Sequence, residues 1–417
     1  MEKFNQYLMP DPRKIAIQDF AYSLPEEKIA LHPLPERDAS KLLIYKNGEL
    51  AEDIYRNIAN HLPANSLLVF NNTKVINARL RFQKSSGSII EILCLEPSGL
   101  INDYSTAMSK TGSVRWNCFV GGAAKWKEKE LIIGNGQLTI KALLVEKRTD
   151  AYVIEFSWEP ANYSFAEVIE SVGDIPLPPY IKRATAPEDI ERYQTIYAKH
   201  DGSVAAPTAG LHFTEKIFQD LSINKIEIGQ ITLHVGAGTF KPVKSLLMEQ
   251  HEMHAEWIDV KIETIKKVLS KIDQVIAVGT TSTRTLETLY WLGVKTILDP
   301  GIVDLDLKQW EVYESPLKDD DIKPELALQA LIKWLERRNQ AGIFTQTQLL
   351  ITPGYSFKIV KAIVTNFHQP QSTLLLLVAA ATKGRWRDIY NHALQHDFRF
   401  LSYGDGNLIF IQQENRT

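Results

Sequence analysis

Cysteine is scarce in this chain of 417 residues, which contains only Cys94 and Cys118. Both lie in apolar, strand-like runs, as buried thiols of a reducing cytosol do; a disulfide between them is the alternative. Long apolar runs are also missing, because the longest, at 373–381, is far shorter than the ~20 residues that cross a bilayer. Residues 1–14 lack the apolar core of a signal peptide. We therefore expect a cytoplasmic protein with no membrane segment.

An excess of charge of one sign is absent as well, because the formal net charge is -3. A nearly neutral protein does not attract nucleic acid through its overall field, so any RNA contact must come from a local basic patch. Common nucleotide-binding motifs are missing: Gly236-Ala237-Gly238 lacks a third glycine and an acidic partner, and no Gly-Lys-Ser/Thr ends a phosphate loop. The spacing of His251-Glu252-Met253-His254 is not that of a zinc-binding His-Glu-x-x-His helix, so we expect no metal.

The chain is long, and its secondary-structure pattern changes along its length. Its 417 residues exceed one ordinary core, so two domains are expected. Between residues 79 and 159, short β-rich runs are separated by polar turns with no helical period, which favours an antiparallel barrel or sandwich. From residue 164 onward helices and strands alternate. We therefore predict an α/β main domain, formed by 1–78 and 160–417, with an inserted all-β, barrel-like domain at 79–159.

Individual elements of the main domain follow from the apolar periods. The expected helices are 54–62, 164–172, 188–199, 262–272, 283–292, 326–338, 372–382 and 387–395. The expected strands are 67–70, 227–235, 274–278, 348–351 and 362–366. Residues 298–347 break the alternation.

Three strand-to-helix junctions share one design, with small or hydroxyl residues just before a helix. They are 208–214, 279–284 and 365–368. Ligands of open α/β sheets bind at the carboxyl ends of strands, so the three junctions are expected to line one pocket. Singly, each junction is as well explained by ordinary helix capping. The longest of them continues a stretch, 202–214, that is rich in small residues, which let a backbone approach a ligand closely.

Ten histidines are present, and most histidines are solvated or satisfied within a core. His212, His234 and His368 lie in or beside the glycine- and threonine-rich motifs, so they are the candidates for proton transfer. The sequence does not rank the three. His61, His200, His392 and His396 have no such context and are set aside.

The stretch Gly202-Ser203-Val204-Ala205-Ala206-Pro207-Thr208-Ala209-Gly210-Leu211-His212-Phe213-Thr214 closely resembles the signature of the S-adenosylmethionine:tRNA ribosyltransferase-isomerases of queuosine biosynthesis. Further blocks that resemble this family are 176–183, 191–198, 233–243, 276–287, 365–377 and 403–405. The resemblance implies an α/β domain with an inserted barrel. It also implies that S-adenosylmethionine donates its ribosyl group to the aminomethyl-deazaguanine at the tRNA wobble position. The group then isomerises to an epoxycyclopentane, and adenine and methionine leave.

The resemblance also implies which residues meet the substrates. Those expected to bind S-adenosylmethionine are Thr208, Ala209, Gly210, Gly236, Gly238, Thr239, Thr280, Thr281, Ser282, Arg284 and Asn366. For Arg284, a pair with the methionine carboxylate competes with a structural salt bridge. Those expected to contact tRNA phosphates are Arg37, Arg79, Lys182 and Arg183. No cofactor beyond this donor substrate, no metal and a monomer are expected.

Some positions depart from the family pattern. Residues 298–347 make a longer connection than the family usually has, so we regard them as a lineage-specific insertion. Gln369-Pro370 and Gly406-Asn407 also replace residues usual in the family. These departures leave open a paralogue that binds RNA without turnover, or that modifies another nucleoside.

Overall fold

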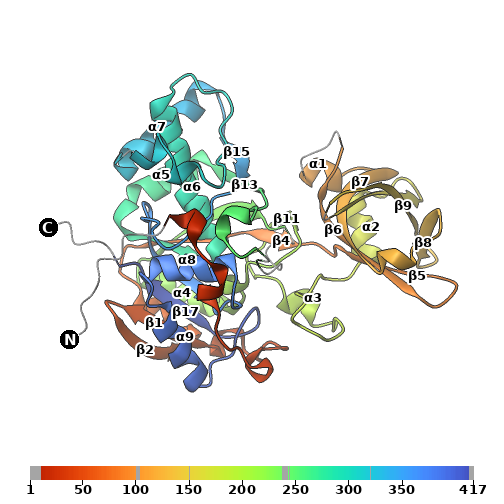
Figure 1. Cartoon of the computed structure of the whole chain (residues 1–417), viewed down its shortest axis with the longest axis horizontal. Coiled ribbons are helices and arrows are strands. Elements are labelled where there is room, and N and C mark those ends of the chain that lie inside the picture. Colours follow the sequence, from red (N-terminus) through yellow and green to blue (C-terminus); the bar gives the residue numbers. More distant parts are fainter. Residues whose placement is uncertain are drawn as a thin grey trace. The chain divides into compact units, whose positions relative to one another are not determined.

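The structure is a computed structural model, and it describes residues 11–99, 104–149, 151–236, 243, 245–319 and 321–412. The chain divides into two compact units. The first contains Met1–Asn72, Pro207–Leu233 and Lys241–Thr417, and the second contains Thr73–Ala206 and His234–Phe240. Each unit has its own sheet and is described separately below (Figure 1).

The first unit is built on a mixed sheet of nine strands. Its order is β15 (Gly342–Thr347), β13 (Glu256–Lys261), β12 (Glu227–His234), β3 (Leu67–Asn71), β14 (Val275–Val278), β16 (Val360–Asn366), β17 (Gly406–Phe410), β1 (Lys41–Lys46) and β2 (Glu49–Ile54). The centre is parallel, because β12 and β14 both run parallel to β3, and β16 runs parallel to β14. Strand β3 is buried along its whole length, as expected for a strand covered on both faces.

Helices surround this sheet. They are α4 (Glu215–Ile223), α5 (Ile262–Ser270), α6 (Thr280–Leu298), α7 (Pro324–Arg337), α8 (Thr373–Ala381) and α9 (Trp386–Gln395). The longest, α6, packs on β3, β14 and β16 and is buried along most of its length. The predicted helix at 54–62 is instead a 3-10 helix, η5 (Tyr55–His61).

Two expected elements of the chain were wrong. The helix predicted at 188–199 is reduced to α3 (Asp189–Arg192), in the second unit, where the carboxylate of Asp189 accepts from the backbone N–H of Ala186 and the guanidinium of Arg183. The strand predicted at 348–351 is coil, and the edge strand β15 lies just before it. An apolar run alone does not distinguish a buried coil from a buried strand.

Residues 298–347 are an integral part of the first unit. Their helix α7 crosses α6 so closely that a side chain on Gly293 would overlap the backbone carbonyl of Ala327. Their strand β15 adds to the sheet by pairing antiparallel with β13. The indole of Trp334 donates to the carbonyl of Ile302, 3.0 Å away, and ties α7 to the preceding coil.

The second unit contains a six-stranded antiparallel sheet that forms a nearly closed barrel (Figure 1). Its order is β5 (Arg79–Gln83), β6 (Ile89–Pro97), β7 (Ser113–Gly121), β10 (Tyr152–Glu159), β9 (Thr139–Lys147) and β8 (Glu130–Gly134). The first and last strands, β5 and β8, approach each other. Alternate side chains point inward, and helix α2 (Phe165–Val172), which begins with a capping box at Ser164, packs into the same core.

The cysteines lie in this core as free thiols. Cys94 and Cys118 are direct cross-strand neighbours on β6 and β7, and both are fully buried. Burial raises the pKa of the Cys118 thiol, which keeps it protonated. The barrel strands span 79–159, whereas the compact unit around them extends from Thr73 to Ala206 and includes a two-stranded parallel sheet, β4 (Thr73–Val75) with β11 (His200–Ser203). Among the described residues, no helix has the length and apolarity to span a membrane.

Candidate active site

Two of the three predicted junctions meet because their strands are parallel neighbours. Val278 of β14 lies opposite Val364 of β16, so both strands end at the same edge of the sheet. Gly279 follows β14 with a φ of +94, a conformation that favours glycine, and its N–H donates to Val364 at 2.8 Å. The third junction forms a 3-10 helix, η7 (Thr208–His212), which packs on β16. A side chain on Gly279 would come within 4.0 Å of Ala209, so all three junctions adjoin.

His212 is at the centre of this group and is only 4% exposed. The amide nitrogen of Asn366, the last residue of β16, lies 3.3 Å from its Nε2. Thr208 holds that amide in place by donating its hydroxyl to Oδ1 of Asn366 at 2.8 Å. On the other side, Nδ1 of His212 faces the carbonyl oxygen of Arg37 at 3.4 Å. Tyr55 stacks on the imidazole, with ring centroids 4.3 Å apart.

These contacts fix the tautomer of His212. A carbonyl oxygen only accepts, so the nitrogen that faces Arg37 carries the proton, and Nε2 presents its lone pair to the amide of Asn366. Behind Asn366, the carboxylate of Asp405 accepts from the backbone N–H groups of Lys41 at 3.0 Å and Arg399 at 2.7 Å. This carboxylate joins the starts of β1 and β17 beneath the site. The arrangement holds the imidazole of His212 in one orientation, as proton transfer by a side chain requires.

The start of α6 supplies hydrogen-bond donors. The helix begins after Gly279 with no side-chain cap, so its first backbone N–H groups have no partner within the helix. The hydroxyl of Ser282 is used internally, since it donates to the carbonyl of Val278 at 2.8 Å. The hydroxyl of Thr281 is buried with no partner among the described residues. With Thr280, which is also buried, this helix start can receive an anionic or polar group.

Arg284 has a carboxylate partner within the protein. Its guanidinium pairs with Glu256 of β13, and its Nε donates to the carbonyl of Leu349 at 2.9 Å. Both members of the pair are buried. Two roles were considered for Arg284, a pair with the methionine carboxylate and a structural salt bridge, and this geometry fits the salt bridge.

His368 is not part of the group around His212. Its Nε2 lies 2.9 Å from the hydroxyl of Thr365, and successive side chains of a strand point to opposite faces, so Thr365 and Asn366 lead away from each other. Its backbone carbonyl accepts from Tyr22 at 2.5 Å. Burial lowers the pKa of His368 to about 4, so its imidazole is neutral at physiological pH.

The remaining candidates for the donor site lie in different parts of the chain. Ala209 and Gly210 are buried within η7. His234 belongs to the second unit, where its ring stacks on Tyr104 with centroids 4.9 Å apart and its Nδ1 lies 3.1 Å from the carbonyl of Gly202. Beyond His234, a side chain on Gly236 would meet nothing within 4 Å. Gly238 and Thr239 lie outside the described residues.

The four predicted RNA-binding cations have different environments. Arg37 donates to the carbonyl of Leu211 at 3.2 Å, within the site itself. Arg79 donates to Leu177 at 3.0 Å, and Arg183 makes a two-pronged pair with the buried Asp189 at 2.7 and 2.8 Å. Lys182 is exposed.

The sequence did not identify Tyr55 or the anchoring role of Asp405. Tyr55 follows β2, far along the chain from His212, and no local pattern marks its ring as a partner of that imidazole. Asp405 lies in a block that resembled the family, but its backbone partners belong to strands that only the fold brings together.

Comparison with known proteins gives a consistent result. The model of a family described as "Queuosine biosynthesis protein" matches residues 17–409. A curated S-adenosylmethionine:tRNA ribosyltransferase-isomerase from Halothermothrix orenii is 37% identical over 403 residues, covering 94% of this chain and 99% of the relative. One from Xylella fastidiosa (strain 9a5c) is 38% identical over 398 residues, covering 94% and 96%. A crystal structure of an S-adenosylmethionine tRNA ribosyltransferase from Thermotoga maritima is 28% identical, covers 94% of this chain and 100% of that one, and has a TM-score of 0.44.

Proposed function

The chain belongs to the queuosine biosynthesis protein family, and we propose that it is an S-adenosylmethionine-dependent tRNA ribosyltransferase-isomerase. It transfers the ribosyl moiety of S-adenosylmethionine to 7-aminomethyl-7-deazaguanine at the tRNA wobble position and isomerises it, giving epoxyqueuosine-tRNA. Adenine and methionine are released. The observation that carries the proposal is that the likeness spans nearly the whole chain, including all three junctions around His212.

Among the three candidate histidines, the geometry favours His212 as the base. The sulfonium of the donor acidifies the C–H bonds of the adjacent 5′ carbon, and removal of that proton needs a base held in a fixed orientation. The imidazole of His212 meets that need, because the amide of Asn366 lies 3.3 Å from its Nε2 and the ring of Tyr55 stacks on it. His368 is less suitable, because burial lowers its pKa to about 4 and weakens it as a base.

We place the donor's polar groups on the residues next to His212. The uncapped start of α6, with Thr280 and Thr281, suits the methionine carboxylate, since helix N-termini bind anions through backbone N–H groups. Thr208 and Asn366 supply a hydroxyl and an amide for the ribose or for the departing adenine. In this arrangement Arg284 is not needed to bind the methionine carboxylate, because Glu256 already neutralises the charge of Arg284.

The second substrate is a tRNA anticodon loop that carries the deazaguanine precursor. Because the net charge of the chain is -3, attraction to RNA must be local, and exposed Lys182 is the phosphate contact that we favour among the four predicted cations. We propose that the enzyme acts as a cytoplasmic monomer.

Adenine release is the direct test. The full chain is incubated with S-adenosylmethionine and tRNA bearing the aminomethyl-deazaguanine, and free adenine is followed by chromatography. The same tRNA with guanine at the wobble position is the control. Adenine formed only with the precursor tRNA supports the proposal. A folded protein that binds the tRNA but releases no adenine is a binding paralogue, and the proposed activity is then wrong.

A further inference from the structure

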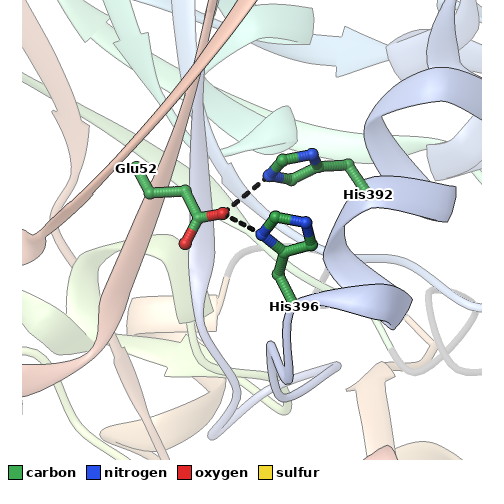
Figure 2. Close-up of side chains that lie close together, drawn as sticks. All are labelled: Glu52, His392 and His396. Atoms are coloured by element: carbon green, nitrogen blue, oxygen red, sulfur yellow. Dashed lines mark hydrogen bonds and ion pairs between the residues drawn. The ribbon is translucent and has the colours of Figure 1, made fainter.

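A cluster of three metal-ligating side chains lies on the first unit, built from residues that the candidate active site does not use. Glu52 on β2, His392 on α9 and His396 just after α9 direct their polar atoms toward one another (Figure 2). Oε1 of Glu52 lies 2.7 Å from Nε2 of His392 and 2.5 Å from Nδ1 of His396. One atom from each residue fits within a span of 4.8 Å.

The helix sets the spacing of the two imidazoles. Residues four apart lie one above the other on a helix face, and the N–H of His396 still donates to the carbonyl of His392 at 3.0 Å, so the helical turn is complete. Their rings stack with centroids 3.8 Å apart. Glu52 reaches them from β2, the edge strand of the sheet, where it lies opposite Leu43 of β1. Two imidazoles thus converge on one carboxylate oxygen that is 340 residues away in sequence from His392.

We propose that Glu52, His392 and His396 form a binding site for a divalent transition-metal ion of the zinc type. Two imidazoles and one carboxylate match the nitrogen and oxygen ligands of such ions, whereas calcium and magnesium prefer oxygen ligands only. Three protein ligands leave the fourth tetrahedral position to water.

Without a metal ion, the same three side chains are held together by hydrogen bonds. Each histidine nitrogen that faces Oε1 carries a hydrogen in the present arrangement, and a metal ion would replace those two hydrogens. In a tetrahedral zinc site, ligand atoms are about 3.3 Å apart, from metal–ligand distances of about 2.0–2.1 Å. The two oxygen–nitrogen separations, 2.7 and 2.5 Å, are shorter than this by less than one ångström, so the Glu52 carboxylate must move back by that amount to admit an ion.

The electrostatic setting is compatible with a cation. The ammonium of Lys41 is engaged by backbone, since it donates to the carbonyls of His396 at 2.8 Å and Asp397 at 3.4 Å. The ligand side chains remain partly exposed, with relative accessibilities of 36%, 24% and 47% for Glu52, His392 and His396, so an ion can enter from solvent.

A bound ion would join the edge strand β2 to the last helix, α9. This predicts a measurable effect on stability, because a ligand that binds only the folded state raises its thermal midpoint. The site and its effect are independent of the proposed transferase activity, since its three ligands are not among the residues assigned to the group around His212.

The test is metal binding by the full chain, freed of any histidine tag and stripped with a chelator. Zinc chloride alone is titrated by calorimetry, and cobalt is added separately, because four-coordinate cobalt absorbs strongly in the visible range. We expect one ion per chain, an absorption band with cobalt and a higher thermal midpoint with zinc. His392→Gln, with one ligand lost, should weaken zinc binding at least about tenfold and abolish the cobalt band.

The matched control is His61→Gln. His61 also pairs with a carboxylate, Asp53 at 2.6 Å, but without a second histidine. It should leave binding unchanged. If the wild type binds no zinc, or if the double variant His392→Gln/His396→Gln keeps full affinity, the cluster is only a hydrogen-bonded clasp and the proposal is wrong. Glu52→Gln, which keeps a hydrogen-bonding side chain, should weaken zinc binding as well, and the thermal midpoint of each variant without zinc shows whether that variant is folded.

Discussion

His212 is the residue whose surroundings are most specific. A carbonyl, an amide and an aromatic ring hold its imidazole from three sides, so its position is fixed before any substrate arrives. A base held in this way contributes mainly to the transition state rather than to donor binding.

Replacing His212 should therefore affect kcat far more than affinity. His212→Gln keeps most of the volume beside Tyr55 and removes the imidazole. We expect kcat to fall by roughly 10²-fold or more, with the affinity for S-adenosylmethionine nearly unchanged. The measurements are adenine release and calorimetric donor binding, with His61→Gln as the control. Normal turnover in a folded His212→Gln variant would transfer the role to His234 or His368.

The pKa of His368 predicts a pH dependence of stability. Burial lowers this pKa to about 4 from the ordinary histidine pKa of about 6.5, so between these pH values the unfolded chain binds a proton that the folded chain does not bind. Stability is therefore complete above pH 6.5 and falls as the pH drops towards 4. At pH 5 the loss is about 2 kcal/mol. Urea unfolding of the wild type and His368→Gln at pH 7 and pH 5 should show this difference, and parallel losses in both proteins would contradict it.

The sequence predicted some residues of the site because local chemistry marks them, and missed others for a physical reason. Thr208, His212 and Asn366 lie in small-residue junctions at strand ends, and they do meet. Tyr55, and the cluster of Glu52 with His392 and His396, depend on contacts between distant segments. The helical spacing of His392 and His396 can be read from the sequence, but nothing in the sequence indicates that Glu52 is their carboxylate partner.

At the scale of elements, α6 has two roles. Its start faces the junctions around His212, and its next turn is tied to β13 and to the coil after β15 through Arg284. The hydroxyls of Ser282 and Thr283 donate to carbonyls four residues earlier, so neither hydroxyl caps the start of the helix.

The roles of Arg284 can be separated by a double-mutant cycle. Arg284→Met leaves the buried Glu256 without a partner, which should cost about 3–5 kcal/mol of unfolding free energy. Adding Glu256→Leu should restore much of that loss. Urea unfolding measures stability, and calorimetry measures donor affinity, which we expect to be nearly unchanged in the folded variants. A stable Arg284→Met variant with weakened donor binding would assign Arg284 to the methionine carboxylate instead.

Elements with a clear period were the predictable ones. The barrel strands β6, β7, β9 and β10 lie where short β-rich runs were expected, because alternation is a local signal. The sequence did not predict strands β5 and β8 or the full length of α6, because packing sets where these elements begin and end. Helix α6 continues to Leu298, since its apolar face is covered by α7, a contact that the sequence does not encode locally.

At the scale of the whole molecule, one sheet forms the mixed core of the first unit and a second, barrel-like sheet forms that of the other. From residue 79 short β-rich runs follow one another without helices, whereas helices and strands alternate in the main domain. This difference predicted two kinds of sheet, because a barrel needs no helices between its strands. The order of the nine strands could not be predicted from the sequence, since long connections join the neighbouring strands β12, β3, β14 and β16.

Recognition of tRNA is a property of the whole molecule, and its salt dependence counts the phosphates that cations neutralise. Lys182 and Arg183 were expected to act alike, but Arg183 is held by the buried Asp189, whereas Lys182 is exposed. Lys182→Ala should therefore weaken tRNA binding and flatten the log–log salt slope by about 1.

The control for this experiment is Lys333→Ala, an exposed lysine on α7, which should leave the slope unchanged. Arg183→Ala should act differently, because it removes the guanidinium that pairs with the buried carboxylate of Asp189, and so lowers the unfolding free energy. Filter binding of precursor tRNA across a range of salt concentrations measures the slopes. An unchanged slope for Lys182→Ala would mean that this cation does not touch a phosphate, and the RNA surface would then have to be sought elsewhere on the chain.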